Sequence, residues 1–164
     1  MKVLGIDPGS HTTGYGIIFS ENQIPHYLGH GLIKMRRNDP LFERLGRVFE
    51  GIVKVIDAYQ PDILAIEKVF FAKNPHSALM LGHARGAALL PGVLKKLKIY
   101  EYSPLEIKQS VVGYGQASKQ QVKEMVMRLL SLHEDLTYDG ADALAVGICC
   151  LQHLKCGFHK RGVT

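Results

Sequence analysis

The stretch Val3-Leu-Gly-Ile-Asp-Pro-Gly-Ser10 begins with a short apolar run, which is typical of a buried strand. Asp7 ends this run, and the three residues after it are turn formers that break the strand. Ile63-Leu-Ala-Ile-Glu67 has the same form, an apolar run that ends in a carboxylate. The carboxyl ends of strands border the ligand crevice of α/β sheets, so Asp7 and Glu67 are predicted to lie side by side if the strands are neighbours.

Further strands and helices are predicted around these two strands. Residues that favour strands predict two more over 12–19 and 26–35, which form an antiparallel meander with the first strand. A fifth strand is predicted over 99–102. Apolar spacing and capping residues predict helices over 40–59, 75–94, 104–112 and 139–154, and another that begins after Ser118. This order predicts an α/β fold, with a mixed five-stranded sheet and helices on both faces.

Proline and capping residues predict where several helices begin, bend or end. Asp39 is expected to cap the first helix, with Pro40 at its first helical position. Pro91 is expected to kink or divide the second helix, because proline removes a backbone hydrogen bond. Ser118 and Gln121 form a capping box at the start of the fourth helix, just after the flexible loop Gly113-Tyr-Gly115.

The composition is that of a globular protein, with 46% apolar and 21% charged residues among 164. We expect one domain over residues 1–155 and a basic, flexible tail over 156–164. The net charge of +5 favours a polyanionic partner without establishing one. Asp7 leaves no room for a signal peptide, and no apolar run is long enough to span a bilayer, so a cytoplasmic protein is expected. The bunched Cys149, Cys150 and Cys156 are expected to be buried, reduced thiols.

Two further acids are placed to join Asp7 and Glu67. Asp139 and Asp142 stand three residues apart at a helix start, which puts both on one face. The apolar stretch that follows must pack on the core, so these acids can reach the end of the sheet. Four carboxylates without equal cationic neighbours would repel one another, and divalent metal ions such as Mg²⁺ best explain such a cluster.

Each acid also has a simpler interpretation. Acids in the first turn of a helix often serve as caps or partners of the helix dipole, which applies to Asp139 and Asp142. Asp7 precedes Pro-Gly and is in a position that suits a turn former. Glu67 can pair with Lys68 or Arg85. The set of four is therefore more informative than any one of its members.

Eight collinear segments, which span nearly the whole chain, resemble the RuvC family of Holliday junction resolvases, or crossover junction endodeoxyribonucleases. The segments are Gly5-Ile-Asp-Pro-Gly, Thr13-Gly-Tyr-Gly, Pro61-Asp-Ile-Leu-Ala-Ile-Glu-Lys-Val-Phe, Ala72-Lys-Asn, Ala84-Arg-Gly, Lys108-Gln-Ser-Val-Val-Gly, Lys119-Gln-Gln-Val and Asp139-Gly-Ala-Asp-Ala-Leu-Ala. The resemblance implies an RNase H-like fold and a homodimer that resolves four-way junctions by paired symmetric nicks during homologous recombination and DNA repair. It also implies cooperation with the branch-migration proteins RuvA and RuvB.

The resemblance also implies roles for individual residues. Asp7, Glu67, Asp139 and Asp142 match the four catalytic acids, which would bind Mg²⁺, with Mn²⁺ as a substitute and two ions in each subunit. Some relatives carry His where this chain has Asp139, so both metal ligation and general-base chemistry stay open there. Phe70, Lys108 and Lys119 match DNA-binding residues: Phe70 would stack on an unpaired base and the lysines would bind the backbone. Taken alone, Phe70 could equally be a core aromatic and each lysine a solvated surface charge.

Two other classes of function compete with a junction nuclease. Gly-x-Asp-x-Gly followed by Thr and Gly also occurs in the first phosphate loop of actin-like and sugar-kinase-like ATPases. Those enzymes close two such lobes around a nucleotide, and this chain has room for one. A non-catalytic junction-binding protein is the third class. The acid set argues against it, because acidic residues that face phosphate add nothing to the affinity of a protein that only binds DNA.

Overall fold

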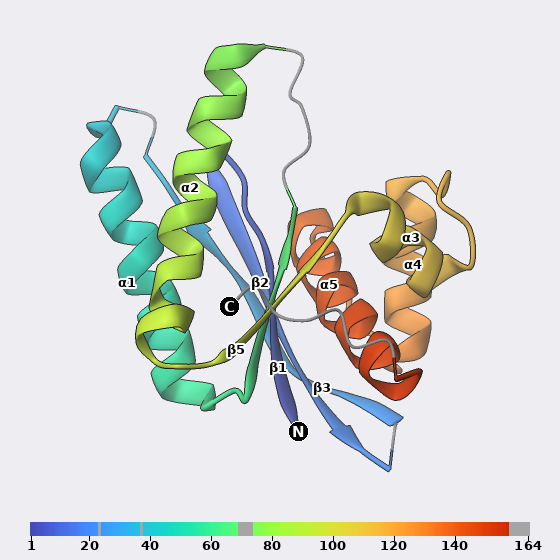
Figure 1. Cartoon of the computed structure of the whole chain (residues 1–164). Helices are drawn as coiled ribbons and strands as arrows, with labels where there is room; N and C mark the ends of the chain where they lie inside the picture. Colours follow the sequence, from blue (N-terminus) through green and yellow to red (C-terminus); the bar gives the residue numbers. More distant parts are fainter. Residues whose placement is uncertain (23, 37, 69–73, 158–164) are drawn as a thin grey trace.

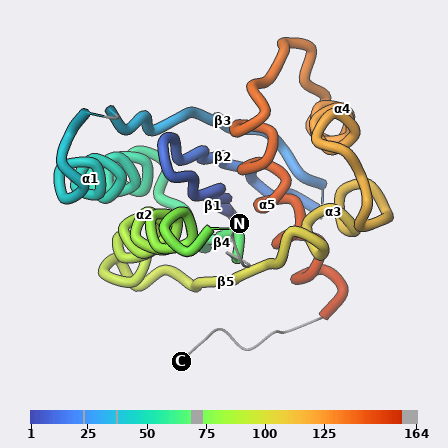
Figure 2. The backbone as a smooth tube through the Cα atoms, turned by 90° about the horizontal axis from the view of Figure 1, so that it is seen from above, coloured from blue at the N-terminus to red at the C-terminus, as the bar shows by residue number. Residues whose placement is uncertain are grey.

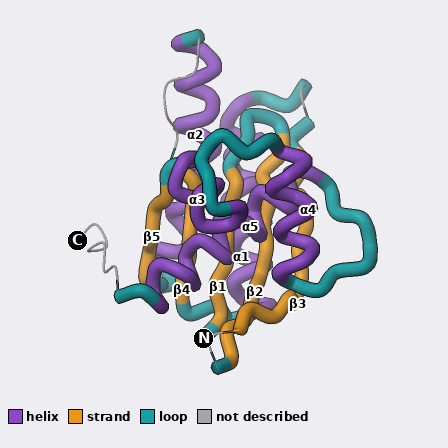
Figure 3. The backbone as a smooth tube through the Cα atoms, turned by 90° about the vertical axis from the view of Figure 1, so that its right-hand side faces the viewer, coloured by secondary structure: helices purple, strands orange, loops and turns teal. Residues whose placement is uncertain are grey.

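A computed structural model describes residues 1–22, 24–36, 38–68 and 74–157 of the chain. Their strands form one five-stranded sheet in the order β3-β2-β1-β4-β5, which Figure 3 shows side by side. The antiparallel part pairs β1 with β2 and β2 with β3, and the parallel part pairs β1 with β4 and β4 with β5. The strands are β1 (Lys2–Asp7), β2 (Thr12–Glu21), β3 (Ile24–Lys34), β4 (Ile63–Glu67) and β5 (Lys98–Tyr102). The mixed sheet predicted from the sequence is confirmed.

Helices cover both faces of the sheet (Figure 1). Viewed along the strands in Figure 2, α1 and α2 lie on one side, and α3, α4 and α5 lie on the other. The helices are α1 (Leu41–Tyr59), α2 (Pro75–Leu94), α3 (Pro104–Val112), α4 (Lys119–Leu129) and α5 (Tyr138–Lys155). Within the described residues, none of these helices is both long and apolar enough to cross a membrane.

The alternation of side chains along β1 and β4 builds a separate core on each face. Leu4 and Ile6 of β1 join the core beneath α1 and α2, whereas Val3 joins the core beneath α5. In β4, Leu64 and Ile66 face the first core, and Ile63 and Ala65 face the second. Side chains alternate with a period of two, so the acids that end these strands, at positions 7 and 67, belong to the α5 face.

Glycines on β1 and β2 let α5 lie directly on the sheet. A methyl group added at Gly5 would come within 2.2 Å of the Ala143 carbonyl oxygen, and one at Gly14 within 2.4 Å of the Asp139 carbonyl oxygen. Such distances are far below van der Waals contact, so only glycine allows this approach. The first turns of α5 are thereby held against the strand that ends in Asp7.

The predicted cap at Asp39 is wrong, and the division of the second helix at Pro91 does not occur. The α1 helix begins at Leu41, with Pro40 as an N-cap that lacks a side-chain hydrogen bond. The carboxylate of Asp39 is instead paired with Arg47 at 3.0 Å, so it does not cap the helix. The α2 helix is not divided at Pro91, which is buried in its last turn, where a missing N–H removes a single intrahelical hydrogen bond.

Among the other local predictions, the capping box at Ser118 is confirmed, and burial of the cysteines is confirmed for two of the three. Ser118 and Gln121 form the reciprocal capping box, with hydrogen bonds of 3.2 and 2.9 Å. Cys149 and Cys150 are buried thiols, whereas Cys156 is exposed because it follows the end of α5. Most of the predicted basic tail, residues 158–164, lies outside the described residues.

Candidate active site

Asp7 and Glu67 meet at the carboxyl edge of the sheet, as the sequence predicts. Their strands are parallel neighbours in which Ile6 pairs with Ile66, so the two acids follow at the next position. Asp142 reaches the same place from α5. The three acids line a cavity of about 260 Å³, and its other walls are Pro104, Ile107, Lys108, Lys119 and Val122.

Burial of these carboxylates makes their charged forms unfavourable. Loss of solvation, together with the nearby charges of Glu67 and Asp142, raises the pKa of Asp7 from 3.8 to about 8. The pKa of Glu67 is also raised, chiefly by burial, while the positive charges of Lys119 and Lys108 act in the opposite direction. A hydrogen bond joins the carboxyl groups of Asp7 and Glu67. The acids of the cavity therefore lack enough nearby positive charge to stabilise their ionised forms.

Lys119 supplies part of that charge. It is the first residue of α4, and its Nζ donates a hydrogen bond of 2.9 Å to Oδ2 of Asp142. The pKa of Lys119 is raised mainly by this hydrogen bond. The Asp142 side chain is 20% exposed and that of Lys119 is 67% exposed, so the lysine reaches into the cavity from the solvent side.

Known proteins resemble this chain over most of its length. The family profile of the crossover junction endodeoxyribonuclease RuvC matches residues 3–150. The chain belongs to the RuvC family. It is 48% identical to the RuvC of Syntrophotalea carbinolica over 97% of this chain and 96% of the relative. Identity with the RuvC of Geotalea uraniireducens is 46%, over 91% of this chain and 87% of the relative.

Solved structures support the same assignment. RuvC of Thermus thermophilus in complex with a Holliday junction substrate is 31% identical, with a TM-score of 0.90 over 96% of each chain. The yeast mitochondrial Holliday junction resolvase Ydc2 is 13% identical and has a TM-score of 0.67, which shows a shared fold alone. The predicted RNase H-like fold is thus confirmed.

The carboxylate oxygens of the cavity suit a hard divalent cation such as Mg²⁺. The buried, mutually repelling acids of the pocket would gain solvation and charge balance from such an ion. Across the described residues, no three acidic, histidine or cysteine side chains converge closely enough to enclose an ion. Oδ2 of Asp142 instead accepts the Lys119 ammonium, so the carboxylate chemistry of the cavity suits a metal although its acids are not gathered around one in this arrangement.

The remaining predicted site residues differ in their placement. Asp139 lies in the first turn of α5, one turn before Asp142, and is not part of the cavity wall. Its backbone carbonyl covers Gly14, while its negative charge contributes to the raised pKa of Lys119. Lys108 and Lys119 both line the cavity with the acids. Phe70 lies outside the described residues.

Arg85 of α2 supports the end of β4 in a way that the sequence did not predict. Its Nε donates to the Glu67 backbone carbonyl at 3.2 Å, and its Nη2 pairs with Glu101 of β5 at 2.6 Å. Arg85 therefore contacts the backbone of Glu67, whereas the sequence suggested a pair with its carboxylate. Arg85 thus bridges the ends of β4 and β5 and helps to fix the position of the Glu67 backbone, from which the side chain extends.

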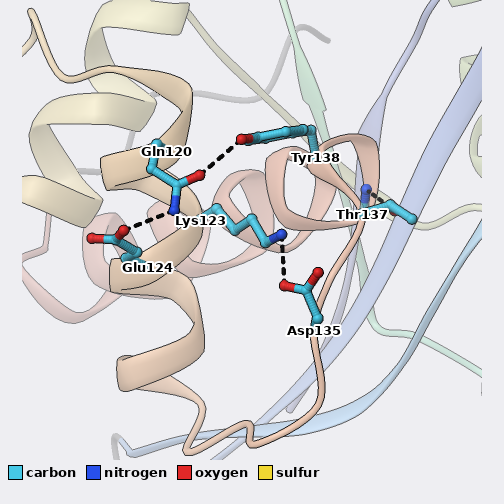
Figure 4. A network of polar contacts seen from close by, with 7 residues as sticks. Gln120, Lys123, Glu124, Asp135, Thr137 and Tyr138 are labelled. Carbon is cyan, nitrogen blue, oxygen red and sulfur yellow. Dashed lines mark hydrogen bonds and ion pairs between the residues drawn. The ribbon is translucent and has the colours of Figure 1, made fainter.

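A polar network joins the starts of α4 and α5 (Figure 4). The Tyr138 hydroxyl donates to Gln120 at 2.8 Å, and Lys123 pairs with Asp135 at 2.7 Å. The Lys123 ammonium also lies 5.1 Å from the centre of the Tyr138 ring. These contacts hold the residue after Lys119 against the residue before Asp139. The network therefore positions Lys119 opposite the acids of α5.

The raised pKa of Asp7 predicts how stability depends on pH in a chelator. The folded protein retains this proton up to about pH 8, whereas the unfolded chain releases it near pH 3.8. Between these values the folded state binds more protons, so the free energy of unfolding should fall as pH rises. Urea unfolding at pH 5 and pH 8 with EDTA measures the slope. Asp7→Asn should flatten it; an equal slope in this variant would contradict the assignment.

Proposed function

We propose that this chain is an endonuclease that resolves Holliday junctions by nicking two opposed strands, as part of recombination and repair. The observation that carries the proposal is the cavity at the sheet edge, where Asp7, Glu67 and Asp142 meet Lys108 and Lys119. The family match over residues 3–150 and the likeness to a RuvC bound to junction DNA support the substrate. Acids that face phosphate favour cleavage over binding alone, because they oppose DNA affinity.

We assign each residue of the cavity a separate role in phosphodiester hydrolysis. Bound Mg²⁺ ions would supply charge for the leaving 3′ oxygen and lower the pKa of the attacking water. Asp7, Glu67 and Asp142 would hold these ions, with Asp139 completing the acid set from the same helix. Lys108 and Lys119 would bind the phosphates on either side of the cut, and Phe70 would stack on a base at the crossover. Two ions per subunit, with Mn²⁺ as a substitute, are part of this proposal.

A labelled four-way junction tests the proposal directly. With Mg²⁺ we expect paired symmetric nicks in two opposed strands, and with EDTA we expect binding without nicks. Binding without nicks at every Mg²⁺ concentration would support a non-catalytic junction-binding protein. Hydrolysis of ATP by the purified chain, without nicks, would support the actin-like or sugar-kinase-like alternative.

We further propose that the active form is a homodimer that packs through α2. One face of this helix exposes Leu79, Leu90 and Val93 to solvent. Gly82 and Gly86 lie on the same face, and a methyl group at either would meet no atom within 4 Å. Positions 79, 82, 86, 90 and 93 recur at helical spacing, so they form one apolar stripe along the helix. Small residues between large apolar ones allow a second helix to approach closely.

The dimer proposal predicts a large effect of a charge placed within this stripe. Leu90→Glu should convert the dimer to a monomer at micromolar concentration, because a buried charge would oppose association. Light scattering coupled to size-exclusion chromatography measures the mass. Ile24→Glu is the matched control, because Ile24 is 58% exposed on β3, compared with 48% for Leu90. The α2 interface is wrong if both variants stay dimeric, or if Ile24→Glu alone dissociates the protein.

The partners RuvA and RuvB, and a place in the cytoplasm, are proposed only from membership of the RuvC family.

A further inference from the structure

The contact between Lys119 and Asp142 lies in the wall of the acid-lined cavity. Asp142 is the acid of the cavity that comes from α5, and its Oδ2 accepts the Lys119 ammonium at 2.9 Å. The three acids of the cavity come from three different elements, and a fourth element, α4, brings this lysine to them. The ammonium therefore takes one of the carboxylate oxygens that a divalent cation would need.

Two other lysines near the site make different contacts. Lys108 of α3 also lines the cavity, but the described residues give it no ion pair with an acid of the site. Lys123 stands one turn after Lys119 on α4 and pairs with Asp135, outside the cavity. Among these three lysines, only Lys119 combines a place in the cavity with a direct bond to one of its acids.

We propose that the Lys119 ammonium occupies the acid site when no metal is bound. It competes with divalent metal ions for Asp142 and so sets the metal concentration that is needed to fill the site. The inference rests on the proposed function, in which Asp7, Glu67 and Asp142 hold the metal. Lys119 is in this sense a positioning residue, because it acts through Asp142.

Electrostatics and mobility both favour this role. An ammonium beside Asp142 lowers the repulsion among the acids when no metal is bound, but it repels an arriving divalent cation. Lysine carries its charge on a flexible four-carbon stem, and the Lys119 side chain is 67% exposed, so it can leave without moving α4. The polar network between α4 and α5 keeps the backbone in place while the side chain departs.

Calorimetric titration of the full chain with Mn²⁺, in the absence of DNA, tests the competition. We expect Lys119→Met to tighten Mn²⁺ binding by roughly fivefold, the factor that corresponds to loss of a partly exposed ion pair. Lys119→Arg should stay close to wild type, because it keeps the charge and the reach to Asp142. Lys95→Met removes an equal charge from an exposed ion pair with Asp57 and should leave the affinity within about twofold, because neither residue lines the cavity.

Thermal unfolding provides a second measurement and shows that each variant folds. Without metal, Lys119→Met should unfold at a lower temperature than wild type, since the acids lose their cation. Saturating Mg²⁺ should raise the unfolding temperature more in this variant than in wild type. If Lys119→Met folds poorly, Lys119→Gln serves in the same titration.

The possible results distinguish a failure of the Lys119 competition from a failure of the proposed metal-dependent function. Equal or weaker Mn²⁺ binding by Lys119→Met would overturn the competition while leaving the metal site intact. The same gain in Lys95→Met or Lys108→Met would also overturn it, because general electrostatics would then explain the change. Failure of wild type and all variants to bind Mn²⁺ would instead remove the metal site from the proposed function, and the inference with it.

Discussion

Asp7→Asn should reduce cleavage of a four-way junction on the order of a thousandfold or more, while junction binding stays within about threefold of wild type. Asp7 ends β1 inside the cavity, beside Glu67 and within reach of the charge of Asp142. The amide keeps the shape of the carboxylate but is a neutral and weaker ligand for Mg²⁺. Binding should persist because the substitution removes a negative charge that opposes the DNA backbone.

Gel-based cleavage and binding assays on the same labelled junction measure both quantities. Asp57→Asn is the matched control, because Asp57 of α1 is 51% exposed, pairs with Lys95 and lies outside the cavity. Its cleavage rate should stay within about twofold of wild type, as expected for a surface substitution. Cleavage by Asp7→Asn at the wild-type rate in Mg²⁺ would remove Asp7 from the catalytic set.

The sequence predicted this site well where the relevant information is local. Asp7 and Glu67 are each the first acid after an apolar strand, and the period of two along a strand sends both to one face. Sequence alone left open whether the two strands were neighbours. That answer depends on the crossover through α1, which returns the chain to pair β4 with β1.

The long-range parts of the site could not be predicted in this way. Asp139 and Asp142 are both on the helix face that the sequence indicates, yet only Asp142 lines the cavity, since that depends on how α5 is seated on β1 and β2. The Lys119–Asp142 pair joins residues 23 positions apart on separate helices, and no local pattern marks it. Arg85 likewise acts on the Glu67 backbone, whereas the sequence suggested its carboxylate.

The prediction at Asp39 failed for a related reason. Asp and Pro in sequence favour an N-cap followed by the first helical residue, which is correct when the aspartate is free to bind the helix. In this protein, Arg47 from the second turn of α1 takes the carboxylate at 3.0 Å. A competing ion pair within the same helix start thus moved the cap by one residue.

Gly5→Ala should destabilise the protein by about 3 kcal/mol or more, because the new methyl group would meet backbone atoms. Its position would lie 2.2 Å from the Ala143 carbonyl oxygen and 2.7 Å from the Gly147 amide nitrogen, both in α5. A flexible side chain could turn away, but helix backbone cannot. The helix must therefore lift off β1, which would also carry Asp142 away from Asp7.

Gly46→Ala is the control for the change from glycine to alanine itself. Gly46 lies within α1, and a methyl group there would meet no atom within 4 Å. Alanine favours helix over glycine, so this variant should gain roughly 0.5–1 kcal/mol. Urea unfolding measures both changes. A loss below about 1 kcal/mol in Gly5→Ala would show that α5 can shift at little cost, and the close seating of that helix would then not explain how the acids are held together.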